Sequence, residues 1–341
     1  MKRSVMFAVV LVAMLAPECL SASYSLKRLD SQIGSYGLGI NNSGQVVGQS
    51  GPMGPAVLYS GGIKYPLPTE GAGWDINEHG VIVGTFQGIG RVPFLYSDGV
   101  LKELLFPGTT SVDGDARAIN NNGDVVGFEL WRDGNGIFTG GAFLYAGGAM
   151  QLLDSTNSTA NDINDIGQIV GRFTNGFLYT NGVSSNPATL PGAVGYEGRA
   201  INENGDIAGV AYFPVPGAGH FHAFAYIDGV MHDLGLGEAT GINELGQVVG
   251  NFYVNDDLFT RPFLYSSGAL YNLGELTTPQ RLFGTDRLDY ASAINDAGQI
   301  TGDYFDNETN AFLLTPVPEP SSFVLAALGL IGLVVWRRRK R

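Results

Sequence analysis

The chain has 341 residues, of which 44% are hydrophobic and only 15% charged, and glycine accounts for 50 of them. The glycines show no strict period of three, so a collagen-like fibre is excluded, and the length allows one large domain or two ordinary ones. Aspartate and glutamate number 32 against 19 lysine and arginine residues, a formal net charge of −13, so phosphates would be repelled and no nucleic-acid partner is expected.

Residues 1–23 are interpreted as a secretory signal peptide. Two basic residues precede the apolar run Val5–Ala16, and small residues follow at Ser21–Ser23, which is the order of a signal sequence. Cys19 is the only cysteine and lies inside this segment, so the mature chain must be stable outside the cytoplasm without disulfides. A lipoprotein signal at Cys19 is the alternative, although the residues before it match a lipobox poorly.

A nine-residue motif, Ile-Asn-x-x-Gly-x-[Val/Ile]-x-Gly in most copies, occurs seven times between residues 40 and 302. Successive copies start 36, 43, 44, 38, 41 and 52 residues apart, a spacing typical of propeller blades. The Asn and the first Gly fit the first and fourth positions of a type I turn that joins two strands. The predicted turn pairs are Asn41 and Gly44, Asn77 and Gly80, Asn120 and Gly123, Asn164 and Gly167, Asn202 and Gly205, Asn243 and Gly246, and Asn295 and Gly298.

One copy resembles the start of a calcium loop, because Asn120, Asn122 and Asp124 place oxygens at alternate positions. Comparison within the chain argues against this reading. The position of Asp124 is Val81 in one copy, and the position of Asn122 is Leu245 in another, and neither side chain can bind a cation. We therefore expect a structural turn and no cofactor, with a weak Ca²⁺ site at 120–124 or 202–206 as the alternative.

Two further segments recur in phase with the motif, an aromatic strand such as Phe143–Tyr145 and a strand that ends in Leu. Each repeat therefore contains four short strands, and no amphipathic helical window appears between residues 24 and 315. The chain begins with a segment like the fourth strand, residues 25–30, and the last repeat stops at the third, Phe312–Leu314. The sequence predicts an all-β, seven-bladed β-propeller in which residues 25–30 pair beside Phe312–Leu314 and close the last blade. An open β-solenoid is the alternative.

The repeats also resemble a bacterial family named after its His-Ala-Phe tripeptide, the HAF family of extracellular repeats. One copy spells the tripeptide, His222-Ala223-Phe224, and the turn motif resembles that family throughout. The resemblance implies extracellular placement and no particular activity.

Few residues suggest chemistry. His220 and His222 lie two apart in a predicted strand and His232 lies in the next, so the three are weak candidates for a zinc site. No serine nucleophile elbow, metalloprotease helix or phosphate loop is present, and no catalytic residue is predicted. Acidic turn residues such as Asp165 and Glu203 could gather on one face and act on sugars.

The loops between repeats vary in length and are the expected place for binding. They are Phe86–Val92, Glu129–Gly140, Tyr212–Gly219, Asn251–Thr260 and Thr277–Tyr290. Trp131, Tyr253, Asp256 and Asp257 would suit a carbohydrate or a Ca²⁺-bridged contact. We expect a structural or adhesive role, with extracellular polysaccharide as the partner. A polysaccharide-active hydrolase or lyase is the alternative.

The C-terminus resembles the PEP-CTERM sorting signal of Gram-negative bacteria. Its three parts stand in order: Pro318-Glu319-Pro320, an apolar run Phe323–Trp336, and a basic cluster with Arg337, Arg338 and Arg339. The resemblance implies recognition by an exosortase-type transpeptidase, removal of the tail, and delivery to the cell surface or the exopolysaccharide matrix. An ordinary tail anchor is the alternative.

Three parts are therefore predicted: a signal peptide at 1–23, the repeat ectodomain at 24–315 and the sorting signal at 316–341. The apolar run is expected to form a short transmembrane helix that holds the chain in the inner membrane before processing, with its basic end in the cytoplasm. Without the seven basic and two acidic residues of the ends, residues 24–315 carry 12 basic and 30 acidic side chains, a formal charge of −18.

Overall fold

The structure is a computed structural model that describes residues 23–88, 90–132, 135–154, 157–214, 220–254, 259–278, 287–305 and 308–317. These residues form 27 β-strands and a single four-residue helix, α1 (Leu273–Leu276). The predicted all-β class is confirmed, and no sheet among the described residues closes into a barrel. Tyr24–Pro316 forms one compact unit. The predicted signal peptide and C-terminal helix lie outside the described residues.

The first four repeats are successive antiparallel meanders. The first consists of β2 (Tyr36–Ile40), β3 (Val46–Gln49), β4 (Pro55–Ser60) and the start of β5 (Ile63–Ile76). The second continues with the end of β5, β6 (Ile82–Gln87), β7 (Arg91–Ser97) and β8 (Val100–Glu103). The third contains β9 (Ser111–Ile119), β10 (Val125–Arg132), β11 (Phe138–Ala146) and β12 (Ala149–Leu152). The fourth contains β13 (Thr159–Ile163), β14 (Ile169–Phe173), β15 (Gly176–Thr180) and β16 (Val183–Ser185).

The last three repeats follow the same order. The fifth contains β17 (Gly195–Ile201), β18 (Ile207–Phe213), β19 (His220–Ile227) and the start of β20 (Val230–Ile242). The sixth continues with the end of β20, β21 (Val248–Val254), β22 (Phe259–Ser266) and β23 (Ala269–Asn272). The seventh contains β25 (Arg287–Ile294), β26 (Ile300–Phe305) and β27 (Thr309–Val317). The long strands β5 and β20 each belong to two neighbouring meanders. The first half of each pairs with the preceding strand, β4 or β19, and the second half pairs with the following strand, β6 or β21.

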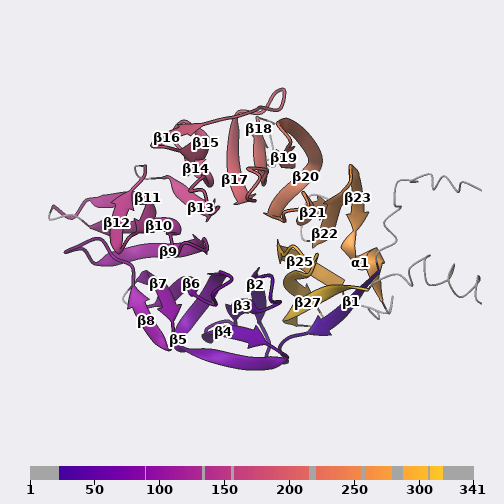
Figure 1. Ribbon diagram of the computed structural model, residues 1–341, viewed down its shortest axis with the longest axis horizontal. Helices are drawn as coiled ribbons and strands as arrows, with labels where there is room; N and C mark the ends of the chain where they lie inside the picture. The colour runs from indigo at the N-terminus through magenta and orange to yellow at the C-terminus, as the bar shows by residue number, and fades with distance from the viewer. Residues whose placement is uncertain are drawn as a thin grey trace, which may run out of the picture. The chain divides into compact units, whose positions relative to one another are not determined.

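The first strands of the seven meanders contact one another in a cycle. Neighbours in this cycle are β2, β5, β9, β13, β17, β20 and β25, and β25 in turn contacts β2. Figure 1 shows these first strands around the centre of the compact unit, with the later strands of each meander farther from the centre. The centre of the compact unit is therefore lined by one strand from every repeat.

The hydrophobic core lies between neighbouring sheets. Phe94, for example, packs with Val47 and Leu67 of the preceding meander, and Phe143 packs with Val83 and Leu104. The Phe that begins each aromatic third strand is 0% exposed in six meanders. The repeated Phe-Leu-Tyr segments thus supply the large side chains that join one meander to the next.

The N-terminal strand β1 (Ser23–Arg28) lies between two strands from the end of the repeat unit. It neighbours β27 on one side, as the sequence predicted, and on the other it pairs in parallel with β24 (Thr277–Thr278). The amide of Leu29 donates to the carbonyl of Ala311 at 2.9 Å, and Tyr24 is 1% exposed. The parallel partner β24 follows α1 and has no counterpart in the other repeats, so the sequence pattern did not predict it.

Candidate functional site

The seven motif turns share one geometry. In each, the amide of the first glycine donates to the carbonyl of the asparagine three residues earlier, at 2.9 to 3.1 Å. These glycines have positive φ angles between 68° and 84°, a conformation that favours glycine over residues with a Cβ. The structure therefore places Asn41 with Gly44, and each of the other six pairs, in the same backbone turn.

The asparagine side chains of these turns link one repeat to the next. The Nδ2 of each donates to the backbone carbonyl of the asparagine in the following copy, at 2.9 to 3.1 Å. The seventh, Asn295, donates to the first, Asn41. Each Oδ1 accepts from the amide four residues later in its own turn. All seven asparagines are thus engaged in a closed cycle of hydrogen bonds.

This cycle bears on the Ca²⁺ alternative. In the third copy the Oδ1 of Asn120 accepts from the Asp124 amide, and its Nδ2 lies 3.5 Å from the Asp124 carboxylate. In the fifth copy the Nδ2 of Asn202 donates to Asp206 at 3.1 Å. An amide nitrogen faces the carboxylate in both turns, where a calcium site requires a further oxygen.

A second cycle runs through the residue that follows each asparagine. Its backbone amide donates to the side-chain oxygen of the corresponding residue in the next copy, at 2.7 to 3.0 Å. The members are Asn42, Glu78, Asn121, Asp165, Glu203, Glu244 and Asp296. We call these residues the acidic crown, since five of the seven carry a carboxylate. The five carboxylates give this end of the compact unit a negative charge. Burial and the charges of Asp165 and Glu244 raise the pKa of Glu203.

Each first strand contains a β-bulge at the same position of the repeat. The bulged residue has no register partner and directly follows the partner of the last glycine of the motif, as Arg117 follows Ala116, the partner of Gly127. The seven bulged residues are Leu38, Trp74, Arg117, Asn161, Arg199, Thr240 and Ser292. All seven line a central cavity of about 220 Å³ to which every first strand contributes. A bulge re-aims a side chain, and here it directs one residue per repeat to the centre.

The last glycine of the motif makes room for this bulge. A Cβ on Gly127 would lie 1.9 Å from the carbonyl oxygen of Asp115, and one on Gly171 would lie 2.0 Å from that of Thr159. A Cβ on any of the other five glycines would lie between 1.8 and 2.2 Å from a backbone carbonyl oxygen in the same way. The last glycine of each motif is therefore needed for the backbone geometry of the central wall.

Polar side chains form an arc on one part of that wall. The Nη1 of Arg117 donates to Asn161 Oδ1 at 2.5 Å, and the Nδ2 of Asn161 donates to Glu197 at 3.0 Å. Arg199 lies 3.2 Å from Glu197 and 3.6 Å from Glu238. The arc thus joins four neighbouring first strands with alternating positive and negative groups.

The arc continues at both ends. Asp115 lies 3.7 Å from Arg117, pairs with Arg91 and accepts from Thr85 at 2.6 Å. Thr85 in turn accepts from the indole nitrogen of Trp74 at 3.1 Å. At the other end, Tyr290 donates to Glu238 at 2.7 Å.

The charges of Glu197 and Arg199 in this arc are stabilised by their neighbours. Burial alone would raise the pKa of Glu197, but Arg199, Tyr212 and Asn161 outweigh it and hold that pKa below its usual value. Burial likewise opposes the charge of Arg199, yet Glu197 and Glu238 raise its pKa. Both groups therefore remain ionised around neutral pH, and neither is poised to exchange a proton.

Two aspartates lie between the arc and the acidic crown. Asp75 accepts from the amides of Ile76 and Ile119, and Asp162 accepts from those of Ile163 and Ile201, at 2.8 to 2.9 Å. Burial, and then the charge of Asp75, raises the pKa of Asp162 to about 8. Each carboxylate thus ties its own strand to the next first strand.

The histidines do not converge. His222 Nδ1 lies 2.9 Å from both carboxylate oxygens of Asp233. His232 is in register with Ala225, so it lies on the opposite face of the sheet from His222. The third histidine, His220, begins the strand β19. Over the described ranges, no three His, Cys, Asp or Glu side chains are placed to hold a metal ion.

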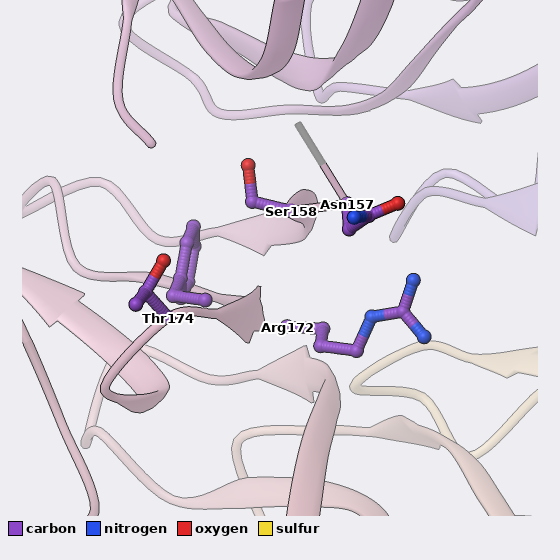
Figure 2. A pocket seen from close by; sticks show the side chains of 5 residues that line it. Asn157, Ser158, Arg172 and Thr174 are labelled. Carbon is purple, nitrogen blue, oxygen red and sulfur yellow. The ribbon is translucent and has the colours of Figure 1, made fainter. Parts of the chain in front are cut away.

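A second hollow of about 400 Å³ lies at the edge of the fourth meander. Figure 2 shows Asn157, Ser158, Arg172 and Thr174 around it, with the Arg172 guanidinium on the same side as Asn157. Asp154 accepts from the amide and the hydroxyl of Thr174 at 2.6 and 2.9 Å. This hollow lacks the continuous arc of paired charges found at the centre.

The variable loops are described only in part, because each of the five contains residues outside the described ranges. Trp131 packs against Phe106 with ring centroids 4.7 Å apart, while Tyr253 is 42% exposed. Asp256 and Asp257 lie outside the described residues. The sequence analysis favoured these loops and missed the central wall, whose signal in the sequence is the last glycine of each motif.

Residues 316–340 match the family model of the PEP-CTERM protein-sorting motif. The chain carries an exosortase sorting signal. This PEP-CTERM motif indicates export and sorting by an exosortase-type system to the cell surface. A search of curated proteins finds no match to the chain.

The match begins one residue before β27 ends. Pro318, Glu319, Pro320 and the arginines Arg337, Arg338 and Arg339 lie outside the described residues. In the part of the chain that the structure covers, no helix has the length and apolar character needed to cross a membrane.

Proposed function

We propose that this PEP-CTERM protein is a seven-bladed β-propeller that is displayed at the cell surface or in the exopolysaccharide matrix and binds extracellular polysaccharide there. The observation that carries the proposal is the closed cycle of seven asparagine hydrogen bonds, which ends where it began, at Asn41. An open solenoid has two ends and leaves the last asparagine without this acceptor. A ring of this kind is a rigid platform for binding.

Localisation supports a role outside the cell. The sorting signal at 316–340 follows the repeats directly, and the repeats resemble extracellular HAF repeats, to which we propose they are related. We propose that residues 1–23 are removed on export. We further propose that the tail crosses the inner membrane as a short helix until an exosortase removes it.

A binding role is favoured over catalysis by the state of the central carboxylates. Glycoside hydrolysis requires one carboxyl with a raised pKa as the general acid beside an ionised partner. Glu197 has a lowered pKa, and Asp115 is paired with Arg91 and Arg117. The two aspartates that line the central cavity, Asp75 and Asp162, have raised pKa values but are engaged by backbone amides.

The test is a glycan-binding screen of the full-length chain in detergent, with and without Ca²⁺, followed by product analysis of every bound glycan. We expect retention of intact polysaccharide and the same binding in the presence of a chelator. Release of shortened glycans would support the enzyme instead, and absence of binding to every glycan would contradict the proposed role.

A further inference from the structure

The central cavity has the size and lining of a small-molecule site. The central cavity that all seven first strands line is joined by a neighbouring hollow of about 290 Å³. The two share Trp74, Arg117, Asn161, Arg199 and Thr240 in their linings. This volume is close to the lower end of the range for ligand pockets, ~300 Å³. The cavity therefore has room for one compact unit rather than for a folded peptide.

The ion pairs of the wall disfavour an anionic ligand at Arg199. Arg199 lies between Glu197 and Glu238, and Arg117 lies between Asp115 and Asn161. An anion that bound Arg199 would compete with Glu197 and Glu238 for that guanidinium and leave a buried carboxylate without its cationic partner, which is unfavourable. The carboxylates of the acidic crown also repel anions from that end of the cavity.

The same wall suits hydroxyl groups. Along the arc, carboxylate acceptors alternate with guanidinium donors, and Asn161 offers both functions. A hydroxyl both donates and accepts, so neighbouring hydroxyls of one ligand can bridge adjacent groups of the arc without disturbing a pair. The Nε of Arg199 lies 3.2 Å from Glu197 in an ion pair but makes no hydrogen bond of good geometry, so a ligand hydroxyl could also accept from it.

Trp74 adds an apolar surface to this wall. Its indole nitrogen donates to Thr85, and Thr85 donates to Asp115, so the ring is held by the same network as the arginines. A fixed aromatic side chain beside polar groups suits a ring with one apolar and one hydroxylated side.

We infer that the central cavity binds a neutral, polyhydroxylated unit, a single sugar residue at the end or on a branch of a neutral polysaccharide. This inference rests on the proposed binding function and locates it in the cavity rather than in the variable loops. Trp74 supports the sugar ring, while Arg117, Asn161 and Arg199 bind its hydroxyls.

Tryptophan fluorescence tests the inference. The chain has three tryptophans, so the full-length Trp131→Phe, Trp336→Phe variant reports on Trp74 alone. The probes are neutral oligomers of glucose, mannose and galactose with α and β linkages, an oligogalacturonate as the acidic probe, and CaCl₂. We expect a saturable change in Trp74 emission with at least one neutral oligomer, and none with the acidic probe or Ca²⁺.

Substitutions then assign the site. Arg199→Gln in the same background should weaken binding at least ~10-fold, since hydrogen bonds to charged groups are lost. Arg132→Gln, an exposed arginine outside the cavity, is the matched control and should bind like the parent. Thermal melting of both variants checks that the fold is retained.

Three outcomes overturn the inference. A response to oligogalacturonate or to Ca²⁺ in place of every neutral oligomer would contradict the neutral ligand, and so would no response to any probe. Glycan retention that survives Arg199→Gln would place binding in the loops, and the proposed function would then stand while the cavity assignment fails.

Discussion

Asn295 donates its side-chain amide to the backbone carbonyl of Asn41 at 2.9 Å, although 254 positions separate the two residues. In a closed ring this bond is equivalent to the six others. Asn295→Ala should therefore destabilise the protein as much as Asn164→Ala, by ~1–3 kcal/mol each, because a buried carbonyl and a buried amide lose their partners. Urea unfolding measures both variants, and a much smaller loss for Asn295→Ala would favour the open solenoid.

The N-terminal strand provides an independent test of closure. Tyr24 is buried between β24 and β27, while Lys27 in the same strand is exposed. Tyr24→Ala should cost about 3 to 5 kcal/mol, the usual loss for a large buried aromatic side chain, and Lys27→Ala should cost almost nothing. Equal unfolding free energies for the two variants would mean that β1 contributes little to the folded unit.

The two invariant glycines of the motif should differ in their response to alanine. Gly123 has φ +84° and open space around it, so Gly123→Ala should cost only about 1 kcal/mol of backbone strain. Gly127→Ala would press a methyl group against the Asp115 carbonyl and should cost more than about 2 kcal/mol. Thermal melting of the pair checks this order, and a reversed order would contradict the bulge geometry.

Asp162 should make the folded state less stable as the pH rises. Its folded pKa of about 8 exceeds the ordinary value of 3.8. Below pH 3.8 both states are protonated and there is no effect. Between the two values the unfolded chain loses the proton first, so stability falls as the pH rises and levels off above pH 8. Asp162→Asn removes this titration at the cost of one amide contact.

The free energy of unfolding of the parent relative to Asp162→Asn should therefore decrease from pH 4 to pH 8. Denaturant titrations of both proteins at several pH values measure this difference. Glu308→Gln, a substitution of an exposed carboxylate, is the control and should leave the pH dependence unchanged. A difference that stays constant or increases with pH would falsify the raised pKa.

Replacement of Pro318-Glu319-Pro320 by alanines should leave the tail attached, because the exosortase-type system would no longer recognise its signal. The mass of the mature protein in the native host measures the outcome. Alanine at Ser321 and Ser322 is the control and should permit normal processing. An identical mature mass for the wild type and the Pro-Glu-Pro variant would count against sorting through this motif.

The all-β class was predictable because the same pattern of short strands and glycine turns recurs seven times in the sequence. A single copy such as residues 119–127 suggested an ion loop, and only the variation at Asp124 and Asn122 among copies separated the turn from a ligand set. The partnership of β1 with β27 was predictable from the phase of the strands at the two ends.

The central arc was harder to foresee. Arg117, Asn161 and Arg199 occupy one repeat position, but strict alternation does not show that a bulge turns this position to the centre. Glu197 and Glu238 become its partners only when the first strands lie side by side. The sequence marks the bulge only through Gly127 and its six counterparts. The reason that glycine is required becomes clear only in the structure, where a Cβ on Gly127 would clash with the carbonyl of Asp115.

The place of β1 sets the order of events during export. Export behind the proposed signal peptide would bring the chain across the membrane from its N-terminus, so β1 would be the first strand to emerge, yet both of its neighbours, β24 and β27, lie near the other end of the chain. The edges of β1 would therefore remain unpaired until nearly the whole ectodomain has crossed the membrane. Completion of the folded unit would then coincide with arrival of the sorting signal, which begins at the end of β27.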